Sequence, residues 1–306
     1  METTIARTVQ FTGAGLHTGR LVRLTVAPAP MRHGIVFHRS DLTGAAAILP
    51  ARWDLVDGTP LCTRLVNAAG TTVSTIEHLM AALAGLGIVN ARIDLDGPEV
   101  PILDGSAAPF VRKLVLAGVV PQAAECRLLK MRKSVEVRHG AASARLDPAD
   151  GFEMDFRIDF TEAAIGHQAL SLNMRNGAFV RELCDSRTFC RQSDVDAMRA
   201  QGLALGGSYD NAVVFDADTV LSPGGLRRPD EPVRHKMLDA LGDLALAGAP
   251  ILGRYTGVRA GHALTNRLLR AVFADPATHE WVTCDAAMAR ALPGTGVRPL
   301  DLALSA

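Results

Sequence analysis

Residues 74–83 read STIEHLMAAL and, with two glycines soon after them, predict a helix that has a serine at its start. A second helix is predicted over residues 232–247, PVRHKMLDALGDLALA, and it ends at Gly248. Each helix carries one histidine near its start, His78 in the first and His235 in the second. These two helices divide the chain into comparable halves.

Strands are predicted on both sides of each helix. In the first half, apolar and β-branched residues predict strands over residues 8–11, 21–26, 35–38 and 89–95, and a further helix over 106–117. In the second half, the same signals predict strands over residues 128–137, 141–146, 152–160 and 251–258, and a helix over 261–273. Each half therefore runs strands, helix, strand, helix, which indicates two similar units.

This order of elements favours an α+β fold over a doubly wound parallel sheet, because consecutive strands are close enough to form hairpins. The simplest arrangement that brings the two histidine helices together packs the helices between two sheets. We predict an N-terminal domain over residues 1–125, which carries Glu77 and His78, and a C-terminal domain over residues 126–306. Residues 192–210 are read as an inserted helix and loop, a type of segment that often contacts ligand.

The composition is that of an ordinary soluble protein. Of 306 residues, 48% are hydrophobic and 21% are charged, which supports a large core and argues against disorder. Lysine plus arginine equals aspartate plus glutamate at 32 each, so no overall charge attracts nucleic acid or an anionic bilayer. Five cysteines without a C-x-x-C pair predict neither a disulfide framework nor a thiolate metal site. We expect a cytoplasmic chain without a membrane span, because no apolar run approaches roughly 20 residues.

Three acid or imidazole side chains follow one another at intervals of four residues on the second helix. His235, Asp239 and Asp243 spread over only about 80° of the helix circumference, at about 100° per residue. One interpretation is the solvent-facing side of an amphipathic helix, and for the spacing by itself this is the simpler one. The other interpretation is a set of metal ligands.

The first helix allows two interpretations of Glu77. In one, Ser74 and Glu77 form a capping box, in which the glutamate bonds back to the helix start. In the other, His78 binds a metal while Glu77 stays outside the ligand set and accepts a proton from water. Together with His235 and Asp239, His78 then supplies three ligands and leaves a fourth position open, as in catalytic zinc sites.

Five stretches of the chain together resemble the UDP-3-O-acyl-N-acetylglucosamine deacetylases of lipid A synthesis, in matching order between about Thr3 and Phe273. They are STIEHL at 74–79, VPILDGSA at 100–107, RTF at 187–189, VRHKMLD at 233–239 and GHALTN at 261–266. Each motif is modest when taken singly, and five in the same order are highly specific. The chain departs from the family pattern after RTF, where Gly-Phe is usual and Cys190-Arg191 stands.

The resemblance implies a fold, a reaction and a metal. The fold is two β-α-α-β layered domains, each with a small insert. The reaction removes the N-acetyl group from UDP-3-O-acyl-N-acetylglucosamine to give the free amine and acetate, an early committed step of lipid A (lipopolysaccharide) synthesis. One Zn²⁺ per chain is held by His78, His235 and Asp239, with Fe²⁺ as the alternative metal, and Glu77 is the general base.

The resemblance also assigns roles outside the ligand set. His262 is the protonated partner of the tetrahedral intermediate, and Asp243 holds its ring and raises its pKa. Thr188 donates a hydrogen bond to the oxyanion, Lys236 contacts oxygens of the substrate, and Phe189 lies where the family contacts ligand.

Two other functions remain open at this stage. Two histidines and one carboxylate also describe the iron site of oxygenases, although those enzymes need no base beside the metal. A protein that binds a sugar nucleotide without turning it over is the second alternative. The proton for the leaving amine comes from Glu77 or from His262, and the sequence does not choose between them. We expect a monomer that approaches the membrane transiently, because the substrate carries an acyl chain.

Overall fold

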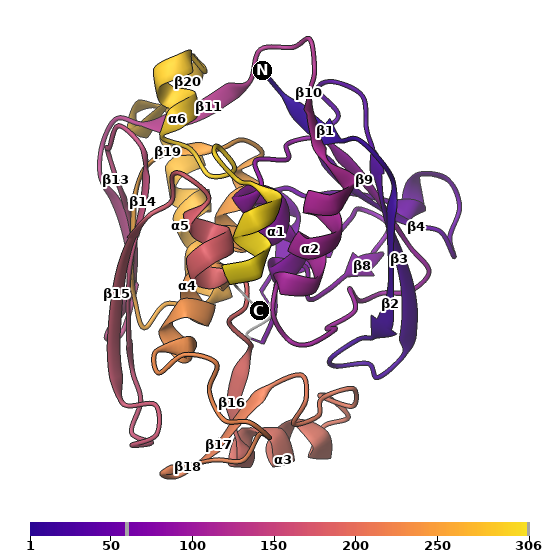
Figure 1. The fold of residues 1–306 in the computed structure, drawn as a ribbon, viewed down its shortest axis with the longest axis vertical. Helices are drawn as coiled ribbons and strands as arrows, with labels where there is room; N and C mark the ends of the chain where they lie inside the picture. Colours follow the sequence, from indigo (N-terminus) through magenta and orange to yellow (C-terminus); the bar gives the residue numbers. More distant parts are fainter. Residues whose placement is uncertain (59–60, 305–306) are drawn as a thin grey trace.

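Two β-sheets form the outer layers of the molecule, and most of the helices lie between them (Figure 1). The computed structural model describes residues 1–58 and 61–304, with side chains up to Leu302. The prediction of an α+β fold with helices packed between two sheets is confirmed.

The first half contains one five-stranded sheet, in the order β2-β3-β9-β4-β5. Its strands are β2 (Val9–Ala14), β3 (Leu21–Pro28), β4 (Ile35–Arg39), β5 (Ile48–Pro50) and β9 (Ala91–Leu95), and its helices are α1 (Glu77–Gly85) and α2 (Ala108–Ala117). Val22, Leu24 and Val26 of β3 face the helices and are buried, as their alternation predicts. A small sheet and a terminal pair complete this half: β6 (Val56–Asp57), β7 (Arg64–Val66), β8 (Thr72–Val73), and β1 (Thr3–Ile5) with β10 (Val119–Pro121).

The second half contains a seven-stranded sheet with β19 at its centre. Its strands are β11 (Arg127–Met131), β12 (Val135–His139), β13 (Ala142–Asp147), β14 (Phe152–Asp159), β15 (His167–Asn173), β19 (Ile251–Val258) and β20 (His279–Thr283). Its helices are α4 (Glu231–Leu244), α5 (His262–Ala274) and α6 (Ala286–Arg290). An insert projects from one end of the molecule (Figure 1) and consists of β16 (Phe189–Arg191), α3 (Gln192–Ala200), β17 (Val213–Asp216) and β18 (Thr219–Val220).

The two halves share one pairing pattern, which confirms the predicted similarity. The strand that follows α1 is β9, and it pairs antiparallel with β3 and parallel with β4. The strand that follows α4 is β19, and it pairs antiparallel with β13 and parallel with β14. In both halves a helix therefore precedes a strand that lies between a parallel and an antiparallel neighbour.

Some elements differ from the sequence prediction. The single strand predicted over residues 128–137 is two strands, because β11 pairs with β19 and β20 while β12 pairs with β13. The sequence also gave no prediction for β15, for β20, or for a π-helical turn over Phe179–Leu183. Neither β11 nor β20 alternates cleanly between apolar and polar residues, so a period of two does not separate them from their loops.

The domain boundary proposed at residue 125 lies in the link between β10 and β11. The end of the chain, however, returns to the first half. Gly294 lies against the backbone of Leu86 and Gly87 at the end of α1. The last 3-10 turn, Pro299–Leu304, contacts α2. We therefore propose that residue 125 separates the two large sheets, while the C-terminal tail packs on both halves.

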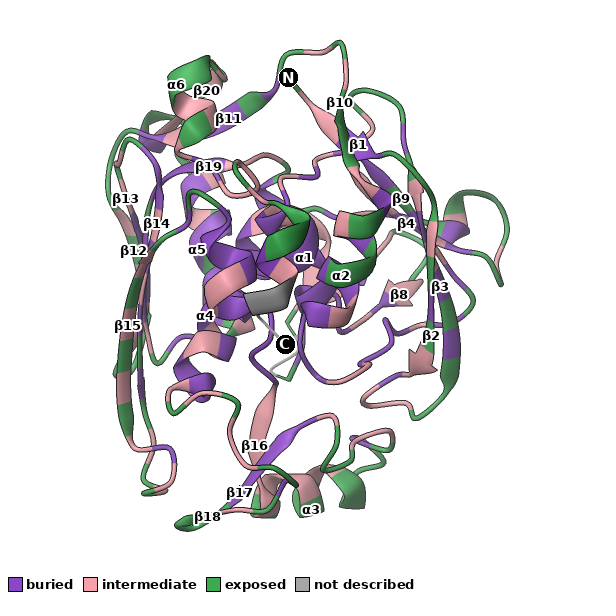
Figure 2. Ribbon diagram, viewed as in Figure 1, coloured by how far each residue is buried: buried purple, intermediate pink, exposed green. Residues whose placement is uncertain are grey.

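The two histidine helices cross at very short range in the centre of the molecule, where most of the ribbon is buried (Figure 2). Gly242 of α4 faces the backbone of Glu77 in α1, and a Cβ atom there would lie 2.1 Å from the carbonyl oxygen of Glu77. Only glycine permits this approach. The crossing thus places the first turn of α1 beside the last turn of α4.

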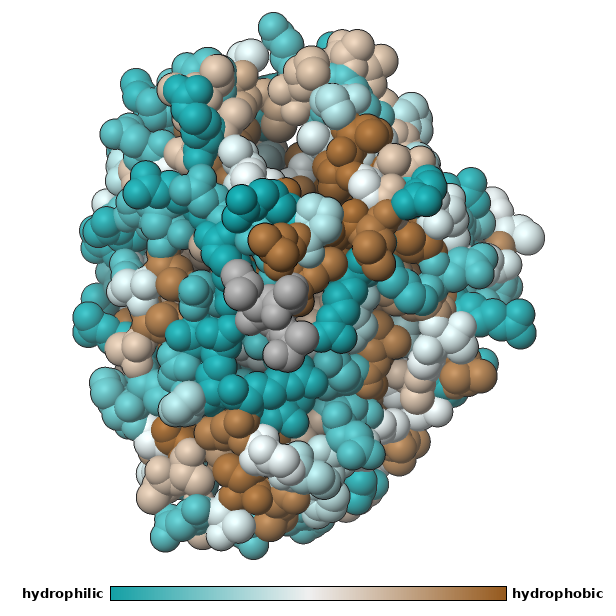
Figure 3. Space-filling view, in the orientation of Figure 1, coloured by the Kyte–Doolittle hydropathy of each residue, from teal (hydrophilic) through white to brown (hydrophobic). Residues whose placement is uncertain are grey.

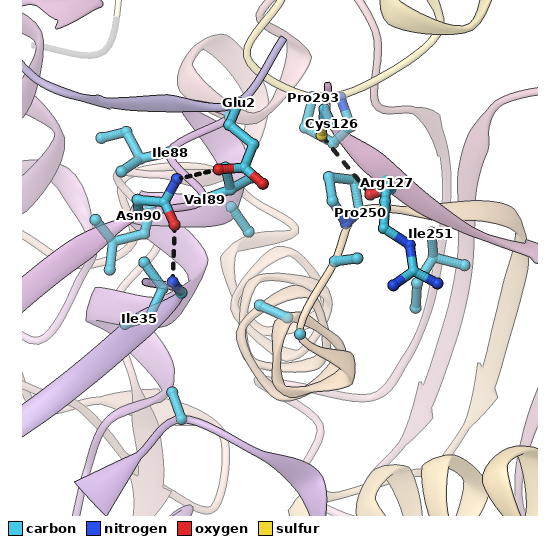
Figure 4. Close-up of a pocket in the computed structure, with 18 of the residues that line it drawn as sticks. Glu2, Ile35, Ile88, Val89, Asn90, Cys126, Arg127, Pro250, Ile251 and Pro293 are labelled. Carbon is cyan, nitrogen blue, oxygen red and sulfur yellow. Dashed lines mark hydrogen bonds between the residues drawn. The ribbon is translucent and has the colours of Figure 1, made fainter. Parts of the chain in front are cut away.

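Two clefts open between the halves at opposite ends of α4. One, of about 800 Å³, lies at the C-terminal ends of α1 and α4, with Glu2 and Asn90 on one wall and Arg127 and Pro250 on the other (Figure 4). None of the predicted site residues lines it. The other, of about 760 Å³, includes His235, Asp239 and His262. In the part of the chain that the structure describes, no helix has the length and apolar character needed to cross a bilayer.

The crossing gives a first prediction. Gly242→Ala should destabilise the protein by about 1–3 kcal/mol, although alanine is normally the better helix former by about 1 kcal/mol, because its methyl group meets backbone. Chemical denaturation measures the difference. Gly58→Ala is the matched control, since its Cβ enters open space and its φ is not positive. Equal stability of both variants and the parent protein would contradict the close crossing.

Candidate active site

Glu77 and His78 lie in the first turn of α1, and both side chains are buried. The helix begins later than predicted and has no side-chain cap. The hydroxyl of Ser74 instead donates to the carbonyl of Pro98. The Glu77 carboxylate accepts a hydrogen bond from the backbone N–H of Thr63 at 3.1 Å, and the backbone N–H of Ser74, which would be its donor in a capping box, donates to Pro98 instead at 2.9 Å. The capping-box interpretation is therefore wrong.

A buried glutamate holds the segment that leads into α1. Thr75 has a left-handed backbone with φ of 58°, and its hydroxyl donates to Glu99 at 2.9 Å. Glu99 is fully buried and also accepts the backbone N–H groups of His17 and Thr18 at 2.8 and 2.9 Å. It thereby fixes a loop whose His17 lines the cleft. No motif in the sequence marks Glu99, because its partners come from two distant segments.

The three acid and imidazole groups of α4 do not face solvent. His235, Asp239 and Asp243 are 2%, 5% and 3% exposed. The interpretation as a solvent-facing side is wrong, because α1 and α5 both pack on this helix and cover it. The sequence pattern of α4 looked amphipathic because its polar face is buried in a polar site.

His78, His235 and Asp239 converge although they come from two helices. Nε2 of His78 and Nε2 of His235 lie 3.6 and 3.2 Å from Oδ1 of Asp239. One potential ligand atom from each residue lies within 4.8 Å of the others, and this is the one such group of three found among the described residues. Oδ1 of Asp239 is buried and accepts no hydrogen bond from the described residues. A buried carboxylate oxygen that faces two imidazole nitrogens without a donor fits a bound metal ion.

A backbone carbonyl orients one of the imidazoles. Nδ1 of His235 lies 3.0 Å from the carbonyl oxygen of Ser186, to which it can donate when it carries the proton. Nε2 of His235 is then unprotonated and faces Asp239, as metal ligation requires. Ser186 precedes the Arg-Thr-Phe motif, but sequence reasoning did not select it because its contribution is a carbonyl that any residue offers.

A second group of side chains lies beside the metal-type cluster. Nε2 of His262 is 3.9 Å from Oε1 of Glu77 and 3.8 Å from Oδ2 of Asp239. Its Nδ1 lies 2.9 Å from Oδ2 of Asp243. Burial raises the pKa of Glu77 to about 7, although nearby His262 acts against this. Burial disfavours the charged form of His262, but Asp243 and the other carboxylates outweigh it and raise the pKa of His262 to about 9. This geometry suits a proton acceptor and a proton donor on the same side of a reacting group.

Thr63 joins these groups and was not found from the sequence. Its backbone N–H donates to Glu77, and its hydroxyl donates to the carboxylate of Asp243. One residue from the first half therefore holds both the acid on α1 and the acid that orients His262. No pattern could mark it, since a single threonine before a short strand is ordinary.

The remaining predicted residues line the same cleft of about 760 Å³. The Nζ atom of Lys236 donates to Oδ2 of Asp239 at 2.9 Å. The ring of Phe189 lies edge-on to the ring of His235, with 6.3 Å between centroids. The backbone of Thr188 pairs with Gly105 from the first half, which leaves its side chain at the cleft wall. The structure thus brings all nine predicted site residues to one place.

Comparison with known proteins identifies the family. The chain matches the family model described as UDP-3-O-acyl N-acetylglycosamine deacetylase over residues 2–274. The chain belongs to this deacetylase family. The match confirms the resemblance that the five sequence stretches indicated, and it ends at the last residue of α5.

Relatives of the deacetylase family align with nearly the whole chain. A protein named UDP-3-O-acyl-N-acetylglucosamine deacetylase from Anaeromyxobacter sp. (strain Fw109-5) is 50% identical to this chain, over 92% of this chain and 91% of its own length. A protein of the same name from Phenylobacterium zucineum (strain HLK1) is 52% identical over 89% of this chain and 93% of its own. That from Shewanella frigidimarina (strain NCIMB 400) is 49% identical over 93% of each.

The ligand set gives a prediction that separates metal binding from proton transfer. Asp239→Asn should reduce bound metal from about one ion per chain to well below that, because the ligand loses its charge. Asp243→Asn is the matched control one helical turn away, and it should keep its metal because Asp243 faces His262. Metal content after dialysis measures both. If Asp239→Asn kept as much metal as Asp243→Asn and the parent protein, Asp239 would be excluded as a ligand.

Proposed function

We propose that this chain removes the N-acetyl group from UDP-3-O-acyl-N-acetylglucosamine, giving the free amine and acetate in an early step of lipid A synthesis. The observation that carries the proposal is the buried cluster of His78, His235 and Asp239, with Glu77 and His262 beside it. Membership of the deacetylase family and the names of the relatives support the same substrate.

We assign the cluster to one Zn²⁺ per chain. Two imidazoles and one carboxylate are a ligand set that catalytic zinc uses, and a zinc ion held by these three residues would need one further ligand, such as water. When bound, zinc lowers the pKa of a coordinated water to about 7 and polarises the carbonyl of the amide. The same ligands also suit Fe²⁺, and metal analysis of the protein as isolated distinguishes the two.

Glu77 is assigned as the base that accepts a proton from the attacking water. Its carboxylate faces the cluster without being one of its ligands, and Thr63 fixes its other oxygen. With a pKa of about 7, Glu77 is half-deprotonated near neutral pH and takes up a proton readily. Burial is what tunes it, because desolvation disfavours the charged form.

His262 is assigned as the protonated partner of the developing negative charge. Asp243 orients its ring and favours the charged form, so that Nε2 carries a proton toward the reacting carbon. The side chain of Thr188 donates to the oxyanion, and Lys236 contacts oxygens of the substrate. Phe189 provides an apolar contact beside the cluster. The proton for the leaving amine is held by Glu77 after the first step and by His262 throughout, so both groups can supply it.

Among the described residues, no helix is long and apolar enough to cross a membrane. We propose that the chain works in the cytoplasm as a monomer and meets the membrane only transiently, because its substrate carries an acyl chain. Balanced charge gives no electrostatic attraction to anionic lipid or to nucleic acid.

The proposed reaction has a direct test. Purified protein incubated with UDP-3-O-acyl-N-acetylglucosamine should release acetate in a stoichiometric ratio to free amine. A chelator should abolish the release, and added Zn²⁺ should restore it, because the metal is bound reversibly. Substrate binding without acetate release would favour the sugar-nucleotide-binding alternative. Release that survives complete removal of metal would refute the metal-dependent mechanism.

The two proton-handling groups are tested together. Glu77→Ala and His262→Ala should each keep their metal and lose about 10²- to 10⁴-fold in kcat. The parent should show a bell-shaped pH profile: the rate falls below about 7 as Glu77 becomes protonated and above about 9 as His262 loses its proton. Glu77→Ala should lose the acidic limb, and His262→Ala the alkaline limb. A variant with parental rate and profile would remove that residue from the mechanism.

A further inference from the structure

A buried ion pair stands at the start of α4, one helical turn before His235. The side chains of Arg187 and Glu231 are 7% and 1% exposed. Nε of Arg187 donates to Oε1 of Glu231 at 2.9 Å, and Nη2 donates to Oε2 at 3.1 Å. Two parallel bonds of this kind fix the orientation of the guanidinium as well as its distance from the carboxylate. The pair therefore joins the residue before Thr188 to the helix that carries His235.

The same carboxylate also holds the backbone around it. Glu231 accepts the backbone N–H of Arg187 at 2.9 Å and that of Arg227 at 2.7 Å. Nη2 of Arg187 donates in addition to the carbonyl of Gly225 at 2.7 Å. Because both charges are buried, moving either side chain away would leave a charged group without a partner in the interior. Arg187 is thus fixed against the first turn of α4 by its side chain and by its backbone.

The backbone next to Arg187 carries the carbonyl that faces His235. The carbonyl oxygen of Ser186 lies 3.0 Å from Nδ1 of His235. The hydroxyl oxygen of Ser186 is buried and has no hydrogen-bond partner among the described residues, so this side chain does not anchor the carbonyl. The bonds between Arg187 and Glu231 therefore tie the carbonyl to the helix of its imidazole partner.

We propose that Arg187 and Glu231 are positioning residues, which hold the Ser186 carbonyl against His235 and so keep Nε2 of this imidazole available to a metal ion. This inference rests on the proposed function, which supplies the metal and the reaction. An imidazole that donates from Nδ1 presents an unprotonated Nε2. Removing the partner that orients a ligand in this way typically costs about 10- to 100-fold in metal affinity or activity. Neither residue of the pair lines the active-site cleft, so neither is placed to touch the substrate.

A buried ion pair is not needed for stability in general. Taking two charges out of water commonly costs as much as their attraction returns, so replacing both partners with apolar side chains of similar volume is often neutral or stabilising. Removing only one partner leaves the other charge buried and unpaired, which is strongly destabilising. Replacing both residues of the pair therefore separates a role in positioning from a role in holding the fold.

The test is the double variant Arg187→Met/Glu231→Leu, which removes both charges. Its midpoint of thermal unfolding should stay within several degrees of the parent midpoint. Its dissociation constant for Zn²⁺, measured by competition with a chelator of known affinity, should rise about 10- to 100-fold. The kcat per bound Zn²⁺ should fall about tenfold, with little change in KM, because the substrate contacts are untouched. Arg187→Lys keeps the buried charges and loses the paired bonds, so it should change both quantities in the same direction by smaller factors.

Asp230→Asn is the matched control on the neighbouring residue. The carboxylate of Asp230 accepts from Nε of Arg234 at 2.7 Å, and its side chain is 36% exposed. Hydrophilic side chains cover the start of α4 at the surface (Figure 3). Among the described residues, Asp230 forms no hydrogen bond or ion pair with residues 185–188. Since exposed ion pairs contribute little to stability, this variant should keep the parental unfolding midpoint, Zn²⁺ affinity and kcat.

The outcomes separate this inference from the proposed function. If the parent protein binds no metal or releases no acetate, the proposed function fails and the inference falls with it. If the parent is active and the double variant keeps the parental Zn²⁺ affinity and kcat, only the inference is overturned. A rise in KM alone would also overturn it, because the pair would then act on substrate binding. If the double variant does not fold, Arg187→Lys decides the question by the same measurements.

Discussion

The close crossing of α1 and α4 is the contact on which the rest of the site depends. At Gly242 the backbone of α4 touches the carbonyl of Glu77, at a distance that admits no side chain. Each helix contributes to the group that could hold a metal ion, His78 from one and His235 and Asp239 from the other. The sheets outside the helices cover them and hold the two halves against each other. A site of this kind exists only while both halves are docked.

Burying so many ionisable groups in one place has a cost, and the site offsets it with specific partners. Lys236 donates to Asp239, and Asp243 pairs with His262 while accepting the hydroxyl of Thr63. Each bond satisfies a group that would otherwise lose its hydration without compensation. The Oδ1 atom of Asp239 accepts no such bond from the described residues, and it is where the chemistry of the donor set fits a cation. The same polar network that orients Glu77 and His262 therefore lies beside an oxygen atom that a metal ion could satisfy.

Sequence periodicity predicted the elements that are long and bounded by clear signals. The helices over residues 74–83 and 232–247 were found because apolar periodicity and terminal glycines agree, and β19 was predicted with its observed limits. The errors lie where a tertiary contact overrides a local motif. Ser74 and Glu77 have the spacing of a capping box, yet both side chains bond to other segments. The polar side of α4 has the spacing of a solvent-facing surface and lies in the interior, because α1 and α5 cover it.

The sequence by itself determined the two similar halves, the helices that carry the proposed ligands, and the family, because these depend on periodicity and on motifs that survive in linear order. Only the tertiary structure decided that the residues meet, and which groups orient them. Thr63, Ser186 and Glu99 act through a hydroxyl, a carbonyl and a carboxylate whose partners lie far away in the chain. The ion pair between Arg191 and Glu162 was also decided there, since the two residues are separated in sequence and meet only when the insert packs on the large sheet. Such contacts are properties of packing, and no local pattern encodes them.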